Sequence, residues 1–560
     1  MIRPFERIVR AVSGRRAAAP GLSATPVEAE YAAWLSGRLA ERSARPRPPA
    51  PAGLLSLITC VYAGSGVRLF AETRDSVLTQ TEASFEWLIL ANGSLPAPLE
   101  QAVTVAAADP RVTLIRRPQN LGIMGGMRVC LEVASGDYVL PLDGDDLLTP
   151  DAVAVLAEAL VAGGLPLFLY GDEDAWVEGE PRHPYLRPDW DPVLNLASSY
   201  VWHPAVFRRD EALRIGVFAD SRSEYCQDWD TLFRFLRAGA EPVHLPEVLY
   251  HWRAHEGSST NRADRVQGSL DSQRHVLEVA LAETSAAQHF EIAEFPLDRG
   301  LPEWWVRRRH VEPPAIDALL LADDPAVRAG GRSHDDHRWS RAEAGPIRAV
   351  RRLPADITVS ELAGHAGSAD ADIVLIADAA LTPIGDDWAW EAAGLLELFP
   401  RVVAVGGRVL DESGVVQTGE LLVGPDGELG CPDAGRAPTD PGYYAFALKP
   451  HLTDAVDGRL MFVRREWLAE ALRELPAQAK SRFLGVWLAA MARRRGGQIA
   501  YSPVVAASAP FGYAWTEMWP VEERAAFAAV WAATPASARW ETRRRAALLG
   551  ENRPCPNPRS

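Results

Sequence analysis

The sequence lacks the features that mark nucleic-acid-binding, disulfide-stabilised and membrane-spanning proteins. Its formal net charge is −16, so it has no excess of basic residues with which to bind nucleic acid. Its 5 cysteines form no C-x-x-C pair, which predicts reduced, buried thiols in a cytosolic protein and neither a zinc site nor a disulfide framework. No apolar run approaches the ~20 residues that span a bilayer.

The first 16 residues, MIRPFERIVRAVSGRR, are basic and have apolar side chains at helical spacing. They lack the apolar stretch and cleavage site of a signal peptide. Two interpretations remain open: a helix lying in a membrane interface, or a terminal helix docked on its own protein. Both predict a cytoplasmic chain, and the first places it at the inner face of the membrane. A Pro-rich stretch at 43–53 predicts a linker, so that residues 1–50 precede the first domain.

A chain of 560 residues is too long for one hydrophobic core, and two or more domains are expected. From residue 54 onward, apolar runs of strand length alternate with stretches of helical periodicity. This alternation predicts an α/β, Rossmann-like domain with a mostly parallel sheet and right-handed crossovers. The expected strands are 54–62, 85–94, 112–122 and 137–146, and the expected helices are 67–80 and 125–135.

Polar residues stand where the expected strands end. They are Asn92–Ser94, Asn120–Gly122 and the acids of DYVLPLDGDD at 137–146. Ligands of parallel α/β sheets bind beyond the carboxyl ends of the strands, so these residues should converge on one edge. Carboxylates of like charge repel one another and resist leaving water. The acidic turn is therefore either solvated or the site of a cation.

Nine segments between about 54 and 262 resemble, in order, those of the family-2 glycosyltransferases. Among them are SVLTQT, FEWLILANGS, NLGIMGG, ASGDYVLPLDGDD, QDWDTLFRF and LPEVLYHWRAHEGSST. The resemblance implies an inverting enzyme with a nucleotide-sugar-binding GT-A fold over residues 51–300. It implies transfer from a nucleotide-diphosphate sugar to a saccharide or lipid-linked acceptor, with Mg²⁺ or Mn²⁺, in surface polysaccharide biosynthesis.

The same resemblance assigns roles to individual residues. Asp143 and Asp145 match the family's D-x-D metal motif, His255 matches a further metal or phosphate ligand, and Asp228 matches the general base. Asn92 stands where many members carry a carboxylate that recognises the base, which leaves the nucleotide open between uridine and deoxythymidine diphosphate. The expected nucleotide-sugar contacts are Tyr62, Asn92, Asn120, Gly122, Asp143 and Arg253. The expected acceptor-side acids are Asp172, Asp174 and Asp230.

Residues 263–300 predict a helix that closes the first domain. After it, residues 311–530 resemble the later half of a second glycosyltransferase domain, which indicates an internal duplication. Its D-x-D position reads Ala377-Asp378-Ala379, and its base position lies in Leu484–Trp487, which has no acid. Because a divalent cation requires several oxygen ligands, we expect a degenerate, non-catalytic GT-A-like domain. Residues 531–560 form a C-terminal tail.

Two other classes of protein share part of this pattern. A nucleotidyltransferase also uses a parallel sheet and a D-x-D site, but it opens with a Gly-rich basic loop, where this chain offers only Arg68. A non-catalytic glycan- or nucleotide-binding protein would explain Asn92. It would leave the combination of Asp143, Asp145 and Asp228 unexplained.

Overall fold

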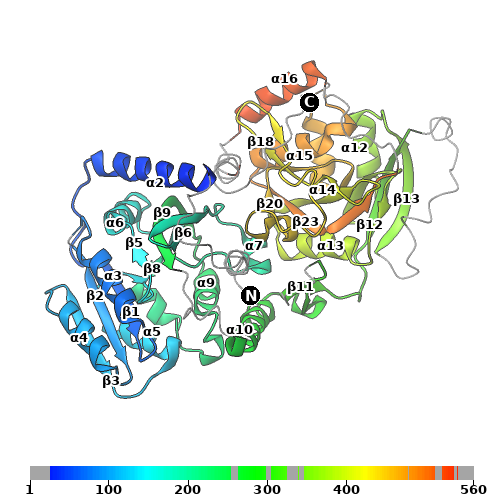
Figure 1. Ribbon diagram of the computed structural model, residues 1–560. Helices are drawn as coiled ribbons and strands as arrows, with labels where there is room; N and C mark the ends of the chain where they lie inside the picture. The colour runs from blue at the N-terminus through cyan, green and yellow to red at the C-terminus, as the bar shows by residue number, and fades with distance from the viewer. Residues whose placement is uncertain are drawn as a thin grey trace. The chain divides into compact units, whose positions relative to one another are not determined.

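The computed structural model of the chain (Figure 1) describes residues 26–82, 84–253, 263–297, 304–323, 346–476, 479–510 and 520–534, with Trp339 and Arg539. The chain divides into two compact units. Of the described residues, the first unit contains those up to Trp190 and Ser199–Ala280, and the second contains Asp191–Ser198 and those from Leu281 onward. The predicted N-terminal basic helix and most of the predicted tail lie outside the described residues.

One sheet of nine strands forms the centre of the first unit. Its strands are β1 (Leu55–Val61), β2 (Glu86–Asn92), β3 (Val112–Arg117), β4 (Tyr138–Pro141), β5 (Leu147–Leu148), β6 (Phe168–Val177), β7 (Glu180–Tyr185), β8 (Ala205–Arg208) and β9 (Val243–Arg253). Their order is β3-β2-β1-β4-β8-β6-β9-β5, with β7 paired to β6. The strands β3, β2, β1 and β4 are parallel, as predicted, and β8 runs antiparallel between β4 and β6.

The first unit has helices on the sheet. They are α3 (Val67–Leu78), α4 (Ala97–Ala106), α5 (Gly122–Val133), α6 (Ala152–Ala162), α8 (Arg209–Arg214), α9 (Gln227–Arg237) and α10 (Ala263–Ala282). Of these, α3, α4 and α5 connect its parallel strands. The helix α3 buries Phe70, Thr73 and Val77, which share one face because a helix repeats every 3.6 residues. Phe70 stacks on Trp87 of β2 with ring centroids 6.1 Å apart. This packing holds the parallel strands in register, so that their carboxyl ends share one edge.

An additional helix, α2 (Pro26–Ala44), packs on the first unit through buried polar contacts. The Tyr31 hydroxyl donates to Asp174 at 2.5 Å. The buried Arg42 guanidinium pairs with Asp151 at 2.8 Å and with Glu247 at 3.0 Å. Because removing one partner of such a buried pair leaves an uncompensated charge, α2 is an integral part of this unit.

The prediction of one helix over residues 263–300 is wrong in its second half. The helix α10 ends at Ala282, and β10 (Phe290–Glu294) pairs antiparallel with β11 (Trp304–Arg308). The alternating segment FEIAE suits a strand, whose side chains point to opposite faces in turn. Its partner strand lies more than ten residues further along the chain, so local helical periodicity does not reveal the pairing.

The second unit is built on a sheet of the order β13-β12-β14-β22-β16-β23-β15, with β17 on β16 and β20 on β23. Its strands are β12 (Ile316–Ala322), β13 (Ile347–Pro354), β14 (Ile373–Asp378), β15 (Thr382–Pro383), β16 (Val402–Leu410), β17 (Val416–Thr418), β20 (His451–Thr453), β22 (Leu460–Arg464) and β23 (Gln498–Ser508). The remaining strands, β18 (Glu420–Val423), β19 (Leu429–Gly430) and β21 (Ala455–Val456), form a three-stranded sheet. Its helices are α7 (Pro192–Ala197), α12 (Val359–Gly367), α13 (Trp388–Leu398), α14 (Arg465–Glu474), α15 (Leu484–Arg494) and α16 (Val521–Ala532).

The two large sheets have the same topology. In chain order, β12, β13, β14, β15, β16, β17, β22 and β23 occupy the places of β1, β2, β4, β5, β6, β7, β8 and β9. Each shared pair also keeps its direction: β12 is parallel to β14, β22 is antiparallel to β14 and β16, and β16 is parallel to β23. Among the described residues, the second sheet has no counterpart of β3. This repetition supports the internal duplication indicated by the sequence.

The short segment Asp191–Ser198 belongs to the second unit, although the sequence places it within the first domain. Asp191 is buried, accepts a hydrogen bond from the Leu194 amide at 2.9 Å and caps α7. Its other oxygen accepts the Leu452 amide at 2.7 Å, and Val193 is part of the apolar core of that unit. These contacts lie far apart in sequence, which explains why the sequence pattern does not reveal them.

Candidate active site

Three carboxylates lie together at the carboxyl end of β4. Asp143, Asp145 and Asp146 each present an oxygen within 4.8 Å of the others. Asp143 and Asp145 are half-buried and Asp146 is buried. Hard divalent cations prefer several oxygen ligands, so this set has the donor chemistry that Mg²⁺ or Mn²⁺ requires.

Asp146 connects the acidic turn to the end of β9. One of its oxygens accepts the Tyr250 hydroxyl at 2.7 Å, and the other accepts the Arg253 amide at 2.7 Å. Burial raises the pKa of Asp146 well above its ordinary value, and the neighbouring charges of Asp145 and Asp143 raise it further. Asp146 therefore positions the turn, while the two more accessible carboxylates face outward.

The Arg253 side chain is buried beside the acidic turn. Its Nη1 pairs with Glu72 at 3.1 Å and donates to the Leu69 carbonyl at 3.4 Å. Its Nε and Nη2 are buried and have no hydrogen-bond partner among the described residues, and burial lowers the pKa of the guanidinium. A buried donor without a partner costs free energy, and an anionic ligand beside the turn would satisfy it. The predicted ligand His255 lies outside the described residues.

Asn92 holds a neighbouring turn through both ends of its amide. Its Oδ1 accepts the Leu121 amide at 2.8 Å, and its Nδ2 donates to the Gly122 carbonyl at 2.8 Å. The Asn120 side chain accepts the Gly122 amide at 2.9 Å within the same turn. Asn92 is buried, and both ends of its amide bind the turn that the sequence predicts to contact the nucleotide. It therefore stabilises the conformation of that turn. Tyr62 follows β1 and is 37% exposed.

Glu224 is a site residue that the sequence pattern does not single out. Its carboxylate accepts the amides of Ile123 at 2.5 Å and Met124 at 3.1 Å, in the first turn of α5. A carboxylate is favoured at a helix N-terminus, where amides are unpaired. Gly122 is required beside it, because its φ is +76° and a Cβ would lie 2.4 Å from a Glu224 oxygen. Glu224 thus ties the segment before α9 to the turn held by Asn92.

The predicted base and its neighbour lie in the first turn of α9. Asp228 is half-buried, and its Oδ1 accepts the Trp229 amide at 2.9 Å. Asp230 is buried and pairs with Arg234 at 2.6 Å, one helical turn further along. The pairing explains Asp230 as a structural group that fixes α9. Its place on the acceptor side stays a prediction.

The other two predicted acceptor-side acids, Asp172 and Asp174, lie inside the sheet, and their acceptor role stays a prediction. Both lie within β6 and are buried, with exposed fractions of 2% and 0%. Asp172 pairs with His244 at 2.9 Å and raises the pKa of that imidazole to about 9, although burial lowers it. Asp174 pairs with His251 at 2.5 Å. A histidine across the sheet and the burial of β6 are tertiary features, so a sequence match to an acidic motif does not separate them from a surface turn.

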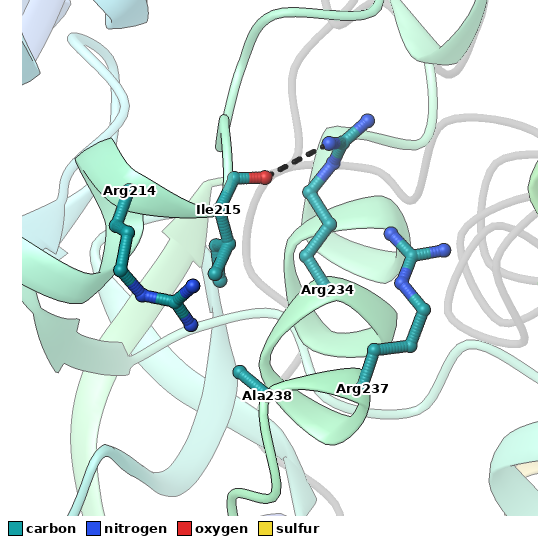
Figure 2. Close-up of a pocket in the computed structure, with 5 residues that line it drawn as sticks. All are labelled: Arg214, Ile215, Arg234, Arg237 and Ala238. Atoms are coloured by element: carbon teal, nitrogen blue, oxygen red, sulfur yellow. Dashed lines mark hydrogen bonds between the residues drawn. The ribbon is translucent and has the colours of Figure 1, made fainter.

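A shallow pocket lined by basic residues lies at the other end of α9 (Figure 2). Its walls include Arg214, Arg234 and Arg237, and Arg234 also donates to the Ile215 carbonyl at 3.1 Å. Along a helix that rises 1.5 Å per residue, Arg237 lies about 13 Å from Asp228. Arg237 is therefore remote from Asp228, whereas Arg234 of the same pocket pairs with Asp230.

The second unit has fewer acids than the first at the positions that correspond to Asp143, Asp145 and Asp228. Tyr138 pairs with Arg208 just before α8, and Ile373 pairs with Arg464 just before α14. Counted five residues onward (138 to 143, 373 to 378), Asp378 takes the place of Asp143, and Ala380 takes the place of Asp145. The sequence predicts that Asp378 is the middle residue of the D-x-D position. The strand register instead places Asp378 at its first residue.

The counterpart of the predicted base is Gly485, the second residue of α15. A Cβ at this position would lie 2.1 Å from the Val456 carbonyl oxygen, a distance that no side chain tolerates. Asp378 accepts the Ala380 amide at 2.9 Å within its own turn. The arrangement offers one carboxylate where the first unit offers three, and backbone fills the place of the base.

In open α/β sheets, ligands bind beyond the carboxyl ends of the strands, which is where the oxygen ligands of the first unit lie. Residues 56–197 match the model of the family described as Glycosyl transferase family 2.

Several known proteins are similar to this chain. The uncharacterised protein y4gI of Sinorhizobium fredii is 27% identical over 77% of this chain and 50% of its own length. The O-antigen biosynthesis protein RfbC of Myxococcus xanthus is 29% identical over 42% of this chain and 19% of its own length. This chain thus spans half or less of the length of these two relatives. The crystal structure of Staphylococcus aureus TarS 1-349 in complex with UDP-GlcNAc is 17% identical, with a TM-score of 0.34 over 41% of this chain and 67% of that one.

Proposed function

We propose that the first unit is an inverting glycosyltransferase that moves a sugar from a nucleotide-diphosphate donor to a saccharide or lipid-linked acceptor. The observation that carries the proposal is the acidic turn after β4, bound through Asp146 to the buried Arg253, whose Nε and Nη2 have no hydrogen-bond partner in the described part of the chain. Carboxylates for a cation and a guanidinium for a phosphate are the groups that a departing nucleoside diphosphate requires. The match of residues 56–197 to the Glycosyl transferase family 2 model supports the same activity.

Each residue has a distinct part in this proposal. Asp143 and Asp145, with His255, would hold Mg²⁺ or Mn²⁺, which neutralises the charge that develops on the diphosphate. Arg253 would donate Nη2 and Nε to a phosphate oxygen, and the turn of Asn120–Gly122 would lie against the nucleotide. Asp228 would take the proton of the attacking hydroxyl, which a carboxylate within hydrogen-bond reach does as a general base. Attack opposite the leaving group inverts the anomeric configuration.

The acceptor class is proposed from the relatives. One is named an O-antigen biosynthesis protein and another, from Escherichia coli, a putative colanic acid biosynthesis glycosyl transferase. Both names concern surface polysaccharides, and we extend that class to this chain. Among the described helices none has the length and apolar character to cross a bilayer, and we propose that residues 1–16 supply a peripheral contact with the membrane.

The second unit is proposed to be a non-catalytic duplicate of the transferase fold. Its sheet topology matches the first unit, but it carries Ala380 and Gly485 where the first unit carries Asp145 and Asp228. We assign it to acceptor binding or to support of the active unit.

The experiment that tests the activity mixes the purified chain with a panel of nucleotide-sugars and Mn²⁺, with and without chelator, and follows release of the nucleoside diphosphate. Metal-dependent slow hydrolysis of one donor is expected. Release of pyrophosphate from a sugar phosphate and a nucleoside triphosphate would identify a nucleotidyltransferase instead. Binding of a donor without turnover in the presence of metal and candidate acceptors would contradict the assignment of an active enzyme.

A further inference from the structure

A row of buried charged groups leads from the interior of the first unit to Asp143. The Arg187 guanidinium, which is fully buried, pairs with Glu173 at 3.0 Å. The other Glu173 oxygen lies 3.2 Å from Nδ1 of His203, and Nε2 of His203 lies 3.9 Å from an Asp143 oxygen. The His203 side chain is 11% exposed and that of Asp143 is 46% exposed. The row thus begins in the core and ends at the acidic turn.

The row fixes which His203 nitrogen faces the turn. The Nδ1 of His203 lies 3.2 Å from Glu173, and a glutamate carboxylate at this place accepts a hydrogen bond from Nδ1–H. In the neutral imidazole the other nitrogen, Nε2, then carries a lone pair. Nε2 lies 3.9 Å from an Asp143 oxygen, a distance that is too long for a hydrogen bond.

The ring of His203 is also fixed in orientation. It stacks on Tyr250 with centroids 4.6 Å apart and an interplanar angle of 11°. The Tyr250 hydroxyl donates to Asp146 and accepts the Asp143 amide at 3.2 Å. Imidazole, phenol and acidic turn are therefore one rigid assembly, and His203 has little freedom to turn Nε2 away from Asp143.

Two electron-pair donors that face each other repel unless a cation lies between them. Ligand atoms that share one cation at bond lengths of about 2.1 Å lie roughly 3–4 Å apart, and the separation of Nε2 and the Asp143 oxygen falls in this range. Metal-binding histidines almost always donate their other N–H to a carboxylate, which sets the tautomer and raises the basicity of the ligand. Glu173 stands in that relation to His203.

We propose that His203 is a ligand of the divalent cation through Nε2, with Glu173 and Arg187 as its positioning residues. The inference rests on the proposed function, and it adds the chemistry of the cation. Imidazole nitrogen binds first-row transition metals better than Mg²⁺, which prefers oxygen. The site is therefore selective for Mn²⁺, or a similar transition-metal ion, over Mg²⁺.

The test measures Mn²⁺ binding to the full chain directly, by the electron paramagnetic resonance signal of free Mn²⁺ and by nitrogen modulation of the bound ion. The wild type is expected to show nitrogen coupling and to prefer Mn²⁺ to Mg²⁺. His203→Ala should lower the Mn²⁺ affinity about 10-fold or more, reduce the nitrogen coupling and change the Mg²⁺ affinity less. His203→Phe keeps a ring to stack on Tyr250 and should have the same effect on Mn²⁺, which covers the case in which the alanine variant fails to fold.

Two further variants sharpen the result. His275→Ala is the matched control, because His275 also pairs with a carboxylate of this unit, Asp220 at 2.9 Å, and should leave Mn²⁺ binding unchanged. His255→Ala shows how much of the nitrogen coupling to Mn²⁺ comes from His255, the other predicted histidine ligand.

If both His203 variants keep the wild-type Mn²⁺ affinity and nitrogen coupling, the proposal is overturned while the transferase assignment stands. If the wild type binds neither Mn²⁺ nor Mg²⁺ in the presence of a nucleoside diphosphate, the metal role in the proposed function fails as well.

Discussion

At the scale of single residues, the acids of the first unit divide by burial into those that face outward and those that support them. Asp143, Asp145 and Asp228 are half-buried. Asp146 and Asp230 are buried and engaged by Tyr250 or Arg234. The buried acids position their neighbours, and the half-buried acids are accessible to a ligand.

Asp145→Asn should abolish metal-dependent turnover while leaving the fold intact. The amide retains one neutral oxygen and loses the charge that a divalent cation requires, and the side chain is not part of the apolar core. Turnover and Mn²⁺ affinity should be measured with the melting temperature, which is expected to stay within a few degrees. Normal turnover in the presence of a chelator would show that the metal role is wrong.

Asp228→Asn should retain donor and metal binding and lower transfer by roughly 10²–10⁴-fold, the usual contribution of a general base. Donor affinity measured by calorimetry distinguishes the two roles of this residue. A parallel loss of donor affinity would make Asp228 a binding residue.

At the scale of elements, α13, α14 and α15 of the second unit take the places of α6, α8 and α9 of the first unit and have different side chains. The helix α13 buries Glu391 between Trp305, whose Nε1 donates to it at 3.0 Å, and Ser502, whose hydroxyl donates at 2.8 Å. Burial raises the pKa of Glu391 to about 7, the charge of Asp387 adds to the shift, and the two hydrogen bonds oppose it.

The stability of this unit should therefore fall as the pH rises. A carboxyl whose folded pKa lies above its unfolded value of 4.5 costs nothing below pH 4.5, and its cost is complete above about pH 7. A shift of this size corresponds to about 3 kcal/mol. Glu391→Gln should raise the melting temperature at pH 8 and leave it nearly unchanged at pH 4.5. Equal effects at both pH values would contradict the shifted pKa.

The helix α15 should tolerate no side chain at Gly485. Gly485→Ala places a Cβ 2.1 Å from the Val456 oxygen, so the backbone must move, and a loss of about 2 kcal/mol or more is expected. Gly364→Ala in α12 is the control, because nothing lies within 4 Å of a Cβ there, and alanine should stabilise that helix by about 0.5–1 kcal/mol. The free energies of unfolding come from denaturant titrations. A neutral Gly485→Ala would show that the place of the base is open.

At the scale of the whole molecule, the two units share a topology and differ in chemistry. The first carries three carboxylates and an arginine at the strand ends, and the second carries Asp378 alone at the corresponding turn. Variants of the second unit can therefore be compared with matched variants of the first unit within one chain.

Asp378→Ala should cost little transfer activity, less than about 2-fold, although it occupies the place of Asp143. A single carboxylate makes a poor site for a divalent cation, and no base lies at Gly485. Turnover of this variant should be measured beside Asp145→Asn in the full chain. If the two lose activity alike, the second unit is a working active site.

The sequence by itself determined the α/β class, the strands β1 to β4, the acidic turn after β4 and the loss of acids in the second half. These are local features, because strand length, helical period and the identity of the residues after a strand depend on neighbouring positions in the sequence. Only the tertiary structure showed that Asp172 and Asp174 are buried in β6. It also showed that the Asn92 amide forms hydrogen bonds with the turn at Leu121 and Gly122. It also brought Glu224 to α5 and His203 to Asp143, because such contacts form between segments whose separation in sequence follows no period.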